Sequence, residues 1–288
     1  MSEALLRALD LDVRRRIDGL LAGDYRATRW GPGTELAQVR PYEPGDDVRQ
    51  IEWNVTARTG DPHVRVQVAE RSMTTWLMLD VSASMTFGTA DRRKADVAEG
   101  VALAVGHVAT RRGNRLGIMT FGAPDPRVLR PTQGRRGMIG LLTALRHEPT
   151  SEAGAFPLAD ALMRGVAVCR QRSAIFVVSD WRGPRDWQRP LMQLAQRHEV
   201  IAVEVRDRRE QELPDAGYLW LVDPETGREL RVDTRDRGVR TRFAEAAAAE
   251  RDDLRHTLTT AAIDHLVLST SGDWLRRLAG FLAIRTSR

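Results

Sequence analysis

Cysteine and long apolar runs are both scarce in this sequence, and each scarcity excludes a class of protein. Cys169 is the single cysteine, so an internal disulfide and a cysteine-based zinc cluster are excluded. No apolar run approaches the roughly 18 residues that a membrane-spanning helix needs. Residues 1–6 lack the basic start and the continuous apolar stretch of a signal peptide. We therefore expect a cytoplasmic protein without a transmembrane segment.

Lysine is equally scarce, because Lys94 is the only lysine among the 44 basic residues. It is not part of a Gly-Lys-Ser/Thr sequence, so a P-loop for ATP is absent. The His-Glu-x-x-His and Gly-x-Ser-x-Gly motifs are also absent, and the six histidines have no metal-ligand spacing. These absences exclude the P-loop, zinc-protease and nucleophile-elbow templates of catalysis.

The net charge of +5 and the pI of about 10.2 favour a nucleic-acid partner only at first sight. The arginines are spread along the whole chain, and charges of both signs alternate, as in residues 206–210 and 233–237. A nucleic-acid site would instead show a local basic patch. We expect a protein partner and no nucleic acid.

Two regions differ in their hydrophobic pattern, which predicts a boundary near residue 73. In residues 1–73 we expect a helical leader at 3–21, an extended segment at 51–55 and a half-exposed strand at 63–70. The sequence Pro44-Gly45-Asp46-Asp47 predicts a tight turn. We expect Trp53 to anchor this region in a core, and Arg49 and Arg58 to pair with Asp46, Asp47 or Glu52.

Residues 74–288 alternate between strand-like and helix-like patterns. The continuous apolar run at 75–79 is typical of a strand buried on both faces of a parallel sheet. We predict further strands at 115–121, 126–130, 174–179, 199–205 and 264–268, and helices at 91–112, 135–146, 157–171, 186–198, 235–260 and 271–284. This alternation predicts an α/β fold with a doubly wound, mostly parallel sheet.

A β-hairpin interrupts the alternation. Residues 218–222 and 228–232 read as two strands around a turn that contains Pro224 and Gly227. The hairpin belongs to an insertion at about 207–233. It is a candidate contact surface.

Oxygen-bearing side chains follow two of the predicted strands. Asp80, Ser82 and Ser84 come directly after the strand at 75–79, and Asp180 ends the strand at 174–179. Ligands of open α/β sheets bind at the carboxyl ends of the strands. Carboxylate and hydroxyl oxygens suit a hard cation and leave a coordination position for water or a partner's acidic side chain. The same residue types also serve as helix caps and turn residues without any metal.

Two stretches of the sequence resemble known families. The pattern Asp80-x-Ser82-x-Ser84, with Asp180 after a later strand, resembles the metal-ion-dependent adhesion site of von Willebrand factor A domains. Residues 40–58 resemble the signature of the bacterial family DUF58, and the resemblance continues through residues 113–117 and 121–122. The resemblance implies a von Willebrand factor A-like fold that has no catalytic activity and that binds Mg²⁺ (or Mn²⁺ or Ca²⁺). It further implies a chaperone-like role in the assembly or activation of protein complexes, with a MoxR-type AAA+ ATPase or its client as partner.

One ligand of the family-type site has no counterpart in this sequence. The family takes a threonine from a loop that here reads Gly154-Ala155-Phe156, and Thr150 and Ser151 are the nearest substitutes. Loss of a ligand weakens cation binding. We therefore consider an adaptor with a weak metal site first, a metal-free scaffold with a vestigial site second, and a metal-dependent hydrolase or nuclease last.

Overall fold

The computed structural model describes residues 38–66, 74–111, 113–145 and 156–286. By its internal contacts the chain divides into two units, Tyr25–Ser72 and a second unit that contains Met73–Arg288. We call them the signature unit and the sheet unit. The predicted helix at 3–21 and the end of the predicted strand at 67–70 lie outside the described residues. The domain boundary at residue 73 stays a prediction.

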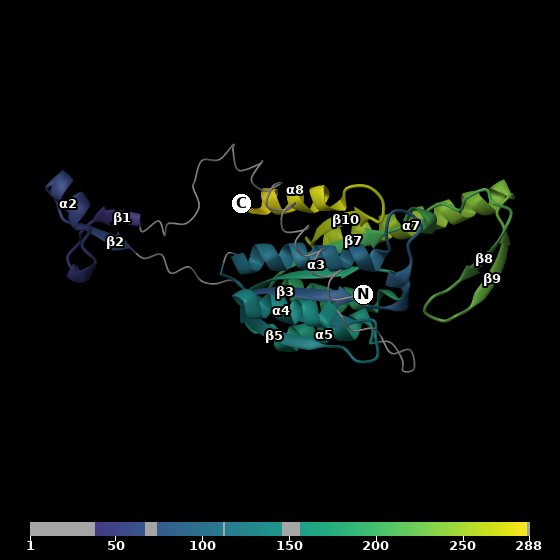
Figure 1. Cartoon of the computed structure of the whole chain (residues 1–288), viewed down its shortest axis with the longest axis horizontal. Helices are drawn as coiled ribbons and strands as arrows, with labels where there is room; N and C mark the ends of the chain where they lie inside the picture. Colours follow the sequence, from purple (N-terminus) through teal and green to yellow (C-terminus); the bar gives the residue numbers. More distant parts are fainter. Residues whose placement is uncertain (1–37, 67–73, 112, 146–155, 287–288) are drawn as a thin grey trace. The chain divides into compact units, whose positions relative to one another are not determined.

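Six strands form the main sheet of the sheet unit (Figure 1). Their order places β3, the first of them along the chain, next to β6, the fourth. The order is β10 (Asp264–Ser269), β7 (Glu199–Arg206), β6 (Ser173–Ser179), β3 (Thr74–Asp80), β4 (Arg115–Phe121) and β5 (Val128–Gln133). The pairs are parallel, except that β5 runs antiparallel to β4. This confirms the predicted α/β fold. The chain changes direction across the sheet between β3 and β6, which makes their carboxyl ends the expected place for a ligand.

Helices cover both faces of this sheet. Leu77 and Leu79 of β3 belong to the core with α3 (Lys94–Arg111), α4 (Gly134–Leu145) and α8 (Trp274–Thr286). Trp76 and Met78 belong to the opposite core, with α5 (Leu158–Val168), α6 (Gln188–Ala195) and α7 (Arg237–Thr260). Successive side chains of a strand point to opposite faces, so the apolar run at 75–79 supplies both cores. All four of these side chains are almost fully buried, and each contributes about 1.5–3 kcal/mol.

The predicted hairpin is present as β8 (Tyr218–Val222) and β9 (Glu229–Asp233), which pair antiparallel. Along the chain the hairpin comes after β7 and before α7. Asp236 begins α7 by accepting hydrogen bonds from the backbone N–H groups of Gly238 and Val239. Short 3-10 helices follow three of the sheet strands, at η2 (Ala83–Thr86), η3 (Arg185–Trp187) and η4 (Arg208–Glu210). Within the described ranges, no helix combines the length and apolar character needed to cross a bilayer.

The signature unit contains β1 (Gln38–Pro41), η1 (Val48–Gln50), α2 (Trp53–Thr59) and β2 (His63–Val66), and β1 pairs antiparallel with β2. The predicted extended segment at 51–55 is wrong beyond its first residue. Ile51 makes an isolated β-bridge with Val64. α2 then begins at Trp53 and ends at Thr59, where Gly60 caps it at φ 82°. Ile51 and Val55 lie four residues apart, a spacing that fits one face of a helix as well as a strand.

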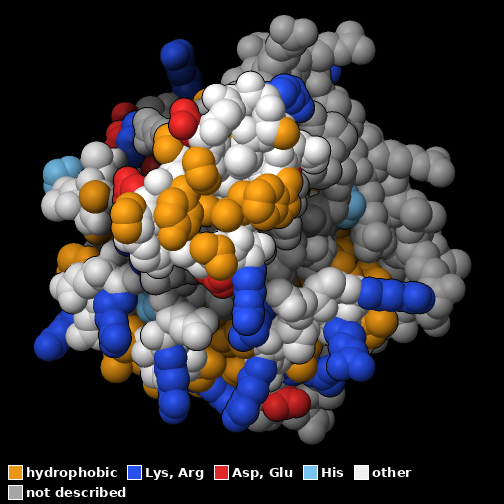
Figure 2. All heavy atoms as spheres, turned by 90° about the vertical axis from the view of Figure 1, so that its left-hand side faces the viewer, with side chains coloured by type: hydrophobic (Ala, Val, Ile, Leu, Met, Phe, Trp, Pro, Cys, Tyr) orange, Lys and Arg blue, Asp and Glu red, His pale blue; other side chains and the backbone are white. Residues whose placement is uncertain are grey.

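Trp53 does not anchor a core, because its exposed fraction is 70%. With Val39 and Val48 it is one of the exposed hydrophobic residues of this unit. Figure 2 shows apolar side chains gathered on the surface of this unit that faces the viewer.

The predicted tight turn is confirmed, since the Asp46 backbone N–H donates to the Glu43 carbonyl and Gly45 has φ 113°. The partner of Asp46 is Arg40, through two guanidinium hydrogen bonds of 2.8 and 2.6 Å. Asp47 accepts from the backbone N–H of Arg49 at the start of η1. Asp46 and Asp47 therefore hold this turn through other groups than the predicted arginine side chains.

Candidate metal-binding site

Asp80 lies at the carboxyl end of β3, where both of its oxygens accept hydrogen bonds. The Ser82 backbone N–H donates to Oδ1 at 2.9 Å, and the Ser179 hydroxyl donates to Oδ2 at 2.5 Å. Burial, together with the nearby charge of Asp180, raises the pKa of Asp80 to about 6. The site therefore holds a carboxyl group whose negative charge is short of a counter-charge.

The three other residues predicted from the sequence lie beside Asp80. The Ser82 and Ser84 hydroxyl oxygens are 3.0 Å apart. Burial alone would raise the pKa of Asp180, but the Lys94 charge, and hydrogen bonds from Lys94, Arg182 and Ser84, lower it below its ordinary value. Since β3 and β6 pair directly, the two carboxylates reach the same end of the sheet. The structure therefore brings Asp80, Ser82, Ser84 and Asp180 together.

Lys94, the only lysine of the sequence, is fully buried next to this cluster. Its Nζ donates to Asp180 Oδ2 at 2.6 Å and to Glu210 Oε1 at 2.7 Å. A buried ammonium is stable only when it is paired and hydrogen-bonded, as it is here. Lys94 therefore neutralises part of the negative charge contributed by Asp180 and Glu210.

Glu210 is held in place by the loop after β7. It forms a capping box with Asp207 at η4. The fully buried Asp207 carboxylate also accepts from the Thr89 and Thr270 hydroxyls at 2.6 and 2.7 Å. The ends of β7 and β10 and the loop before α3 are thus tied together around Lys94.

The backbone after Asp180 adopts a conformation that is rare for a bulky residue. Trp181 has φ 60° and is buried, and its Nε1–H donates to the Val203 carbonyl at 3.2 Å. Such a conformation costs about 1–3 kcal/mol and persists only where the surroundings impose it. Trp181 directly follows Asp180, so its buried indole and the hydrogen bond to Val203 constrain the backbone beside that carboxylate.

Gly122, at the end of β4, packs closely against Asp80. A Cβ atom at this position would lie 2.6 Å from Asp80 Oδ1 and 2.7 Å from the Ser82 nitrogen. Gly122 also has φ 85°, which favours glycine, and its N–H donates to the Phe156 carbonyl. The close approach of β4 to Asp80 therefore depends on the absence of a side chain at this position.

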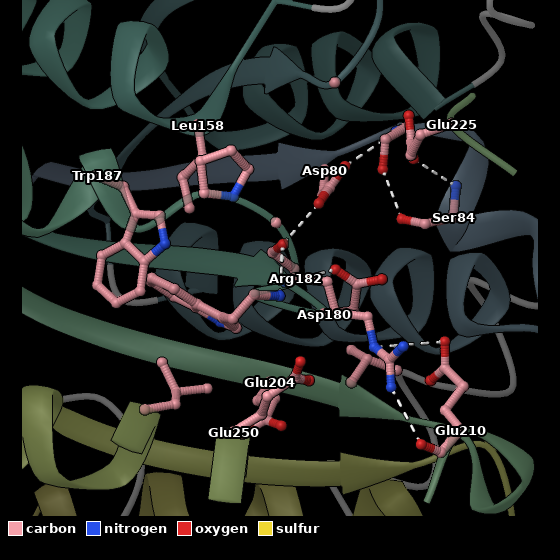
Figure 3. Close-up of a pocket in the computed structure, with 18 of the residues that line it drawn as sticks. Asp80, Ser84, Leu158, Asp180, Arg182, Trp187, Glu204, Glu210, Glu225 and Glu250 are labelled. Carbon is pink, nitrogen blue, oxygen red and sulfur yellow. Dashed lines mark hydrogen bonds and ion pairs between the residues drawn. The ribbon is translucent and has the colours of Figure 1, made fainter. Parts of the chain in front are cut away.

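A cavity of about 740 Å³ opens in front of these residues. Its walls come from the carboxyl ends of β3, β6 and β7, from residues 181–187, from α7 and from the tip of the hairpin. Figure 3 shows Asp80, Ser84 and Glu225 at one side of the cavity and Glu204 and Glu250 at another. Glu225 belongs to the hairpin tip, and its Oε1 accepts a hydrogen bond of 2.8 Å from the Ser84 backbone N–H.

The donor set fits a weakly held hard cation. Two carboxylates and two hydroxyls supply only oxygen ligands, as Mg²⁺ prefers. Of the three carboxyl groups in the cluster, Asp180 and Glu210 pair with Lys94, and Glu210 also lies 3.7 Å from the Arg182 guanidinium. Burial beside Asp180 disfavours the ionised form of Asp80, so an added positive charge is favourable next to Asp80. Against strong binding, Lys94 already occupies one oxygen of Asp180. No cluster of three or more His, Cys, Asp or Glu with metal-ligand geometry occurs in the described part of the chain.

The sequence interpretation missed four residues of this cluster, namely Lys94, Ser179, Glu210 and Glu225. Lys94 stood out as the only lysine but was not assigned to the site, and Glu210 has the spacing of a capping box from Asp207. Ser179 adjoins Asp180, whereas nothing in the sequence links Glu225 to Ser84, 141 positions away. Thr150, Ser151, Gly154 and Ala155 lie outside the described residues, so the missing threonine ligand stays a prediction.

Comparison with known proteins gives relatives that are described as uncharacterised. Uncharacterised proteins of Mycobacterium tuberculosis and Mycobacterium bovis are each 42% identical to this chain over 288 residues, which is 98% of the chain and 89% of each relative. Among solved structures, BatB of Bacteroides thetaiotaomicron matches 75% of this chain and all of its own, with a TM-score of 0.48 and 15% identity. A von Willebrand factor type A protein from Catenulispora acidiphila matches 47% of this chain and 33% of its own, with a TM-score of 0.36 and 13% identity.

The family model described as a protein of unknown function, DUF58, matches residues 38–253. That range holds the turn at residues 44–47 and the strand-end cluster. We use this name for the residues Asp80, Ser82, Ser84, Lys94, Ser179, Asp180, Glu210 and Glu225. The chain therefore belongs to the DUF58 family.

Proposed function

We propose that this chain is a non-enzymatic adaptor that binds an acidic side chain of a partner protein through a weakly held Mg²⁺ or Mn²⁺ at Asp80, Ser82, Ser84 and Asp180. The observation that carries the proposal is the convergence of these four side chains beside a cavity, at the point where the sheet changes direction. From the family resemblance we extend it to a MoxR-type AAA+ ATPase, or its client, as the partner in the cytoplasm.

The electrostatics of the site support a bridging cation. Asp80 is buried beside a second carboxylate, so its ionised form lacks compensation. A divalent ion bound by Asp80, Ser82 and Ser84 supplies that compensation and keeps a coordination position for a carboxylate of the partner.

A metal-free scaffold is the second candidate, and Lys94 is the observation that favours it. Its ammonium already pairs with Asp180, which reduces the affinity of the cluster for another cation. In that case the cluster fixes the loops around the cavity, and binding is independent of divalent ions.

Thermal unfolding in a series of Mg²⁺ and Mn²⁺ concentrations separates the two candidates. For a site of millimolar affinity, a tenfold excess of metal adds about 1.4 kcal/mol, which raises the Tm by a few degrees. We expect this rise in the wild type and its loss in Asp80→Asn and in Ser82→Ala. Ser82→Ala is the milder change, because the backbone N–H that supports Asp80 remains.

Ser269→Ala provides the matched control. Ser269 and Ser271 form a similar hydroxyl pair, 2.9 Å apart, at the carboxyl end of β10. This variant should keep the full metal response. An equal response in Ser82→Ala and Ser269→Ala would show that the metal acts elsewhere, and no response in the wild type would favour the scaffold.

Partner binding is tested with the same variants. We expect a purified MoxR-type ATPase of the same organism to bind the wild type in Mg²⁺ and to lose most of its binding in EDTA or with Ser82→Ala. Binding of unchanged strength in EDTA would contradict a bridging cation.

A further inference from the structure

The hairpin β8–β9 ends in a turn that is built to present one carboxylate. The Asp223 carboxylate accepts from the Glu225 backbone N–H at 3.0 Å and from the Thr226 hydroxyl at 2.6 Å. The Asp223 backbone pairs with Arg228 and Gly227, and Gly227 has φ 69°. The Asp223 carboxylate is therefore hydrogen-bonded within the turn, and Glu225 is the acidic side chain of the turn that points outward.

Glu225 reaches the candidate site. Its Oε1 accepts a 2.8 Å hydrogen bond from the Ser84 N–H, which belongs to the first turn of η2 (Figure 3). Asp223, Pro224, Glu225 and Thr226 all line the cavity in front of Asp80 and Asp180. A carboxylate carried by a distant insertion therefore lies beside the residues that the proposed function assigns to a partner's carboxylate.

The contact is made in a way that permits release. Glu225 is exposed, so water and other carboxylates can compete for the Ser84 N–H. A second cavity of about 560 Å³ lies between Leu221 and Leu230 of the hairpin and Phe87, Leu213 and Phe243 of the body. The part of the hairpin near its turn is thus separated from the body by open space.

The base of the hairpin, by contrast, is firmly fixed. Thr234 is fully buried, and its hydroxyl and backbone N–H each donate to the Gly217 carbonyl at 2.8 Å. The guanidinium groups of Arg231 and Arg235 lie over the Tyr218 ring at 4.2 and 5.0 Å. The hairpin therefore has a fixed base, whereas its tip contacts Ser84 through the exposed Glu225 side chain.

We infer that the hairpin tip is a built-in occupant of the Asp80–Ser84–Asp180 site, in which Glu225 holds the place of a partner's carboxylate until the partner displaces it. The inference rests on the proposed function and adds to it the regulation of the site and the class of its partner. The tip itself indicates the class of partner, because it is a compact acidic turn whose Glu225 side chain points outward. The partner is accordingly a protein that presents Glu or Asp at the tip of an exposed loop.

The experiment compares Glu225→Ala with Glu229→Ala. Both variants remove one carboxylate from the hairpin, but Glu229 lies in β9 opposite Val222, away from the turn that reaches Ser84. Hydrogen–deuterium exchange is measured without metal for segments 81–88 and 218–232. We expect exchange at least about tenfold faster in both segments for Glu225→Ala, and wild-type exchange for Glu229→Ala.

The second arm uses a synthetic peptide with the sequence of residues 221–229 as the probe. The tip of the wild type competes with this peptide at a millimolar effective concentration. We expect the peptide to bind Glu225→Ala at least about tenfold more tightly than it binds the wild type or Glu229→Ala. Adding Asp80→Asn to Glu225→Ala should remove that binding.

The outcomes separate this inference from the proposed function. Wild-type exchange and wild-type peptide affinity in Glu225→Ala overturn the built-in occupant, even where Mn²⁺ stabilises the wild type and not Asp80→Asn. Faster exchange and tighter peptide binding that are the same in EDTA and in Mn²⁺ support the occupant and contradict the bridging cation. Failure of the peptide to bind any variant also overturns the inference.

Discussion

Replacing Lys94 with Met removes the one buried ammonium while keeping most of the side-chain volume. The ammonium lies 2.6 Å from Asp180 and 2.7 Å from Glu210, and Lys94 has no exposed surface. At an effective dielectric constant of about 20, each pair gains about 6 kcal/mol before desolvation. Desolvation of the three ions offsets most of this gain. Arg182 remains 3.7 Å from the partly buried Glu210, but the buried Asp180 carboxylate loses its ammonium. This loss should cost about 3–5 kcal/mol, a large share of the usual unfolding free energy of about 5–15 kcal/mol.

Urea unfolding of the wild type and Lys94→Met in EDTA measures this loss directly. A second background, Asp180→Asn, tests whether charge is the cause. With Asp180 neutral, Lys94→Met should cost at least about 1 kcal/mol less than it does in the wild type. Mn²⁺ should also stabilise Lys94→Met more than the wild type, because the variant leaves one more negative charge in the cluster uncompensated.

Two results would refute this reasoning. A loss below about 1 kcal/mol would mean that the ammonium contributes no more than an exposed pair. An equal loss in both backgrounds would show that Lys94 acts through packing, and that the interaction with Asp180 does not matter.

Two further predictions concern packing and pH. Gly100→Ala should destabilise the sheet unit by about 1–3 kcal/mol, because a Cβ atom there would overlap the Trp274 ring. Gly280→Ala, where a Cβ has open space, should be neutral or up to about 1 kcal/mol stabilising; equal urea midpoints for the two variants would contradict this packing. Although burial opposes it, hydrogen bonds from His265 and Arg206 lower the pKa of the buried Glu204 below its ordinary 4.5. The stabilisation that ionised Glu204 provides is therefore complete above pH 4.5 and is lost as the pH falls further. Glu204→Gln should flatten the pH dependence of the unfolding free energy below pH 4.5. Parallel pH profiles for the wild type and this variant would contradict the prediction.

The elements of the sheet unit were predictable because each has its own periodic pattern. The apolar run at 75–79 indicates a strand covered on both faces, and β3 extends it by one residue at each end. The hairpin was visible as two strand-like runs around Pro224 and Gly227. Short elements were less certain, since residues 51–55 fit a helix and a strand equally well and the structure forms α2.

Half of the strand-end cluster could also be inferred from the sequence. Asp80, Ser82 and Ser84 lie within five positions after a buried strand, so their proximity follows from local geometry. Asp180 required the further assumption that β3 and β6 are neighbours, which the sheet order confirms. Pairing of strands about 100 residues apart depends on how the helices pack on both faces of the sheet, and no local pattern records it.

The sequence by itself determined the α/β class, the position of the hairpin and the oxygen-bearing side chains after β3. Only the tertiary structure decided that Lys94 is the counter-ion of Asp180 and that Glu225 lies against Ser84. A buried charge needs a partner, but the sequence does not say which carboxylate the fold will bring to it. The physical reason is the same for Glu225: a side chain on a rigid insertion is placed by where the ribbon ends in space, far from where it lies along the chain.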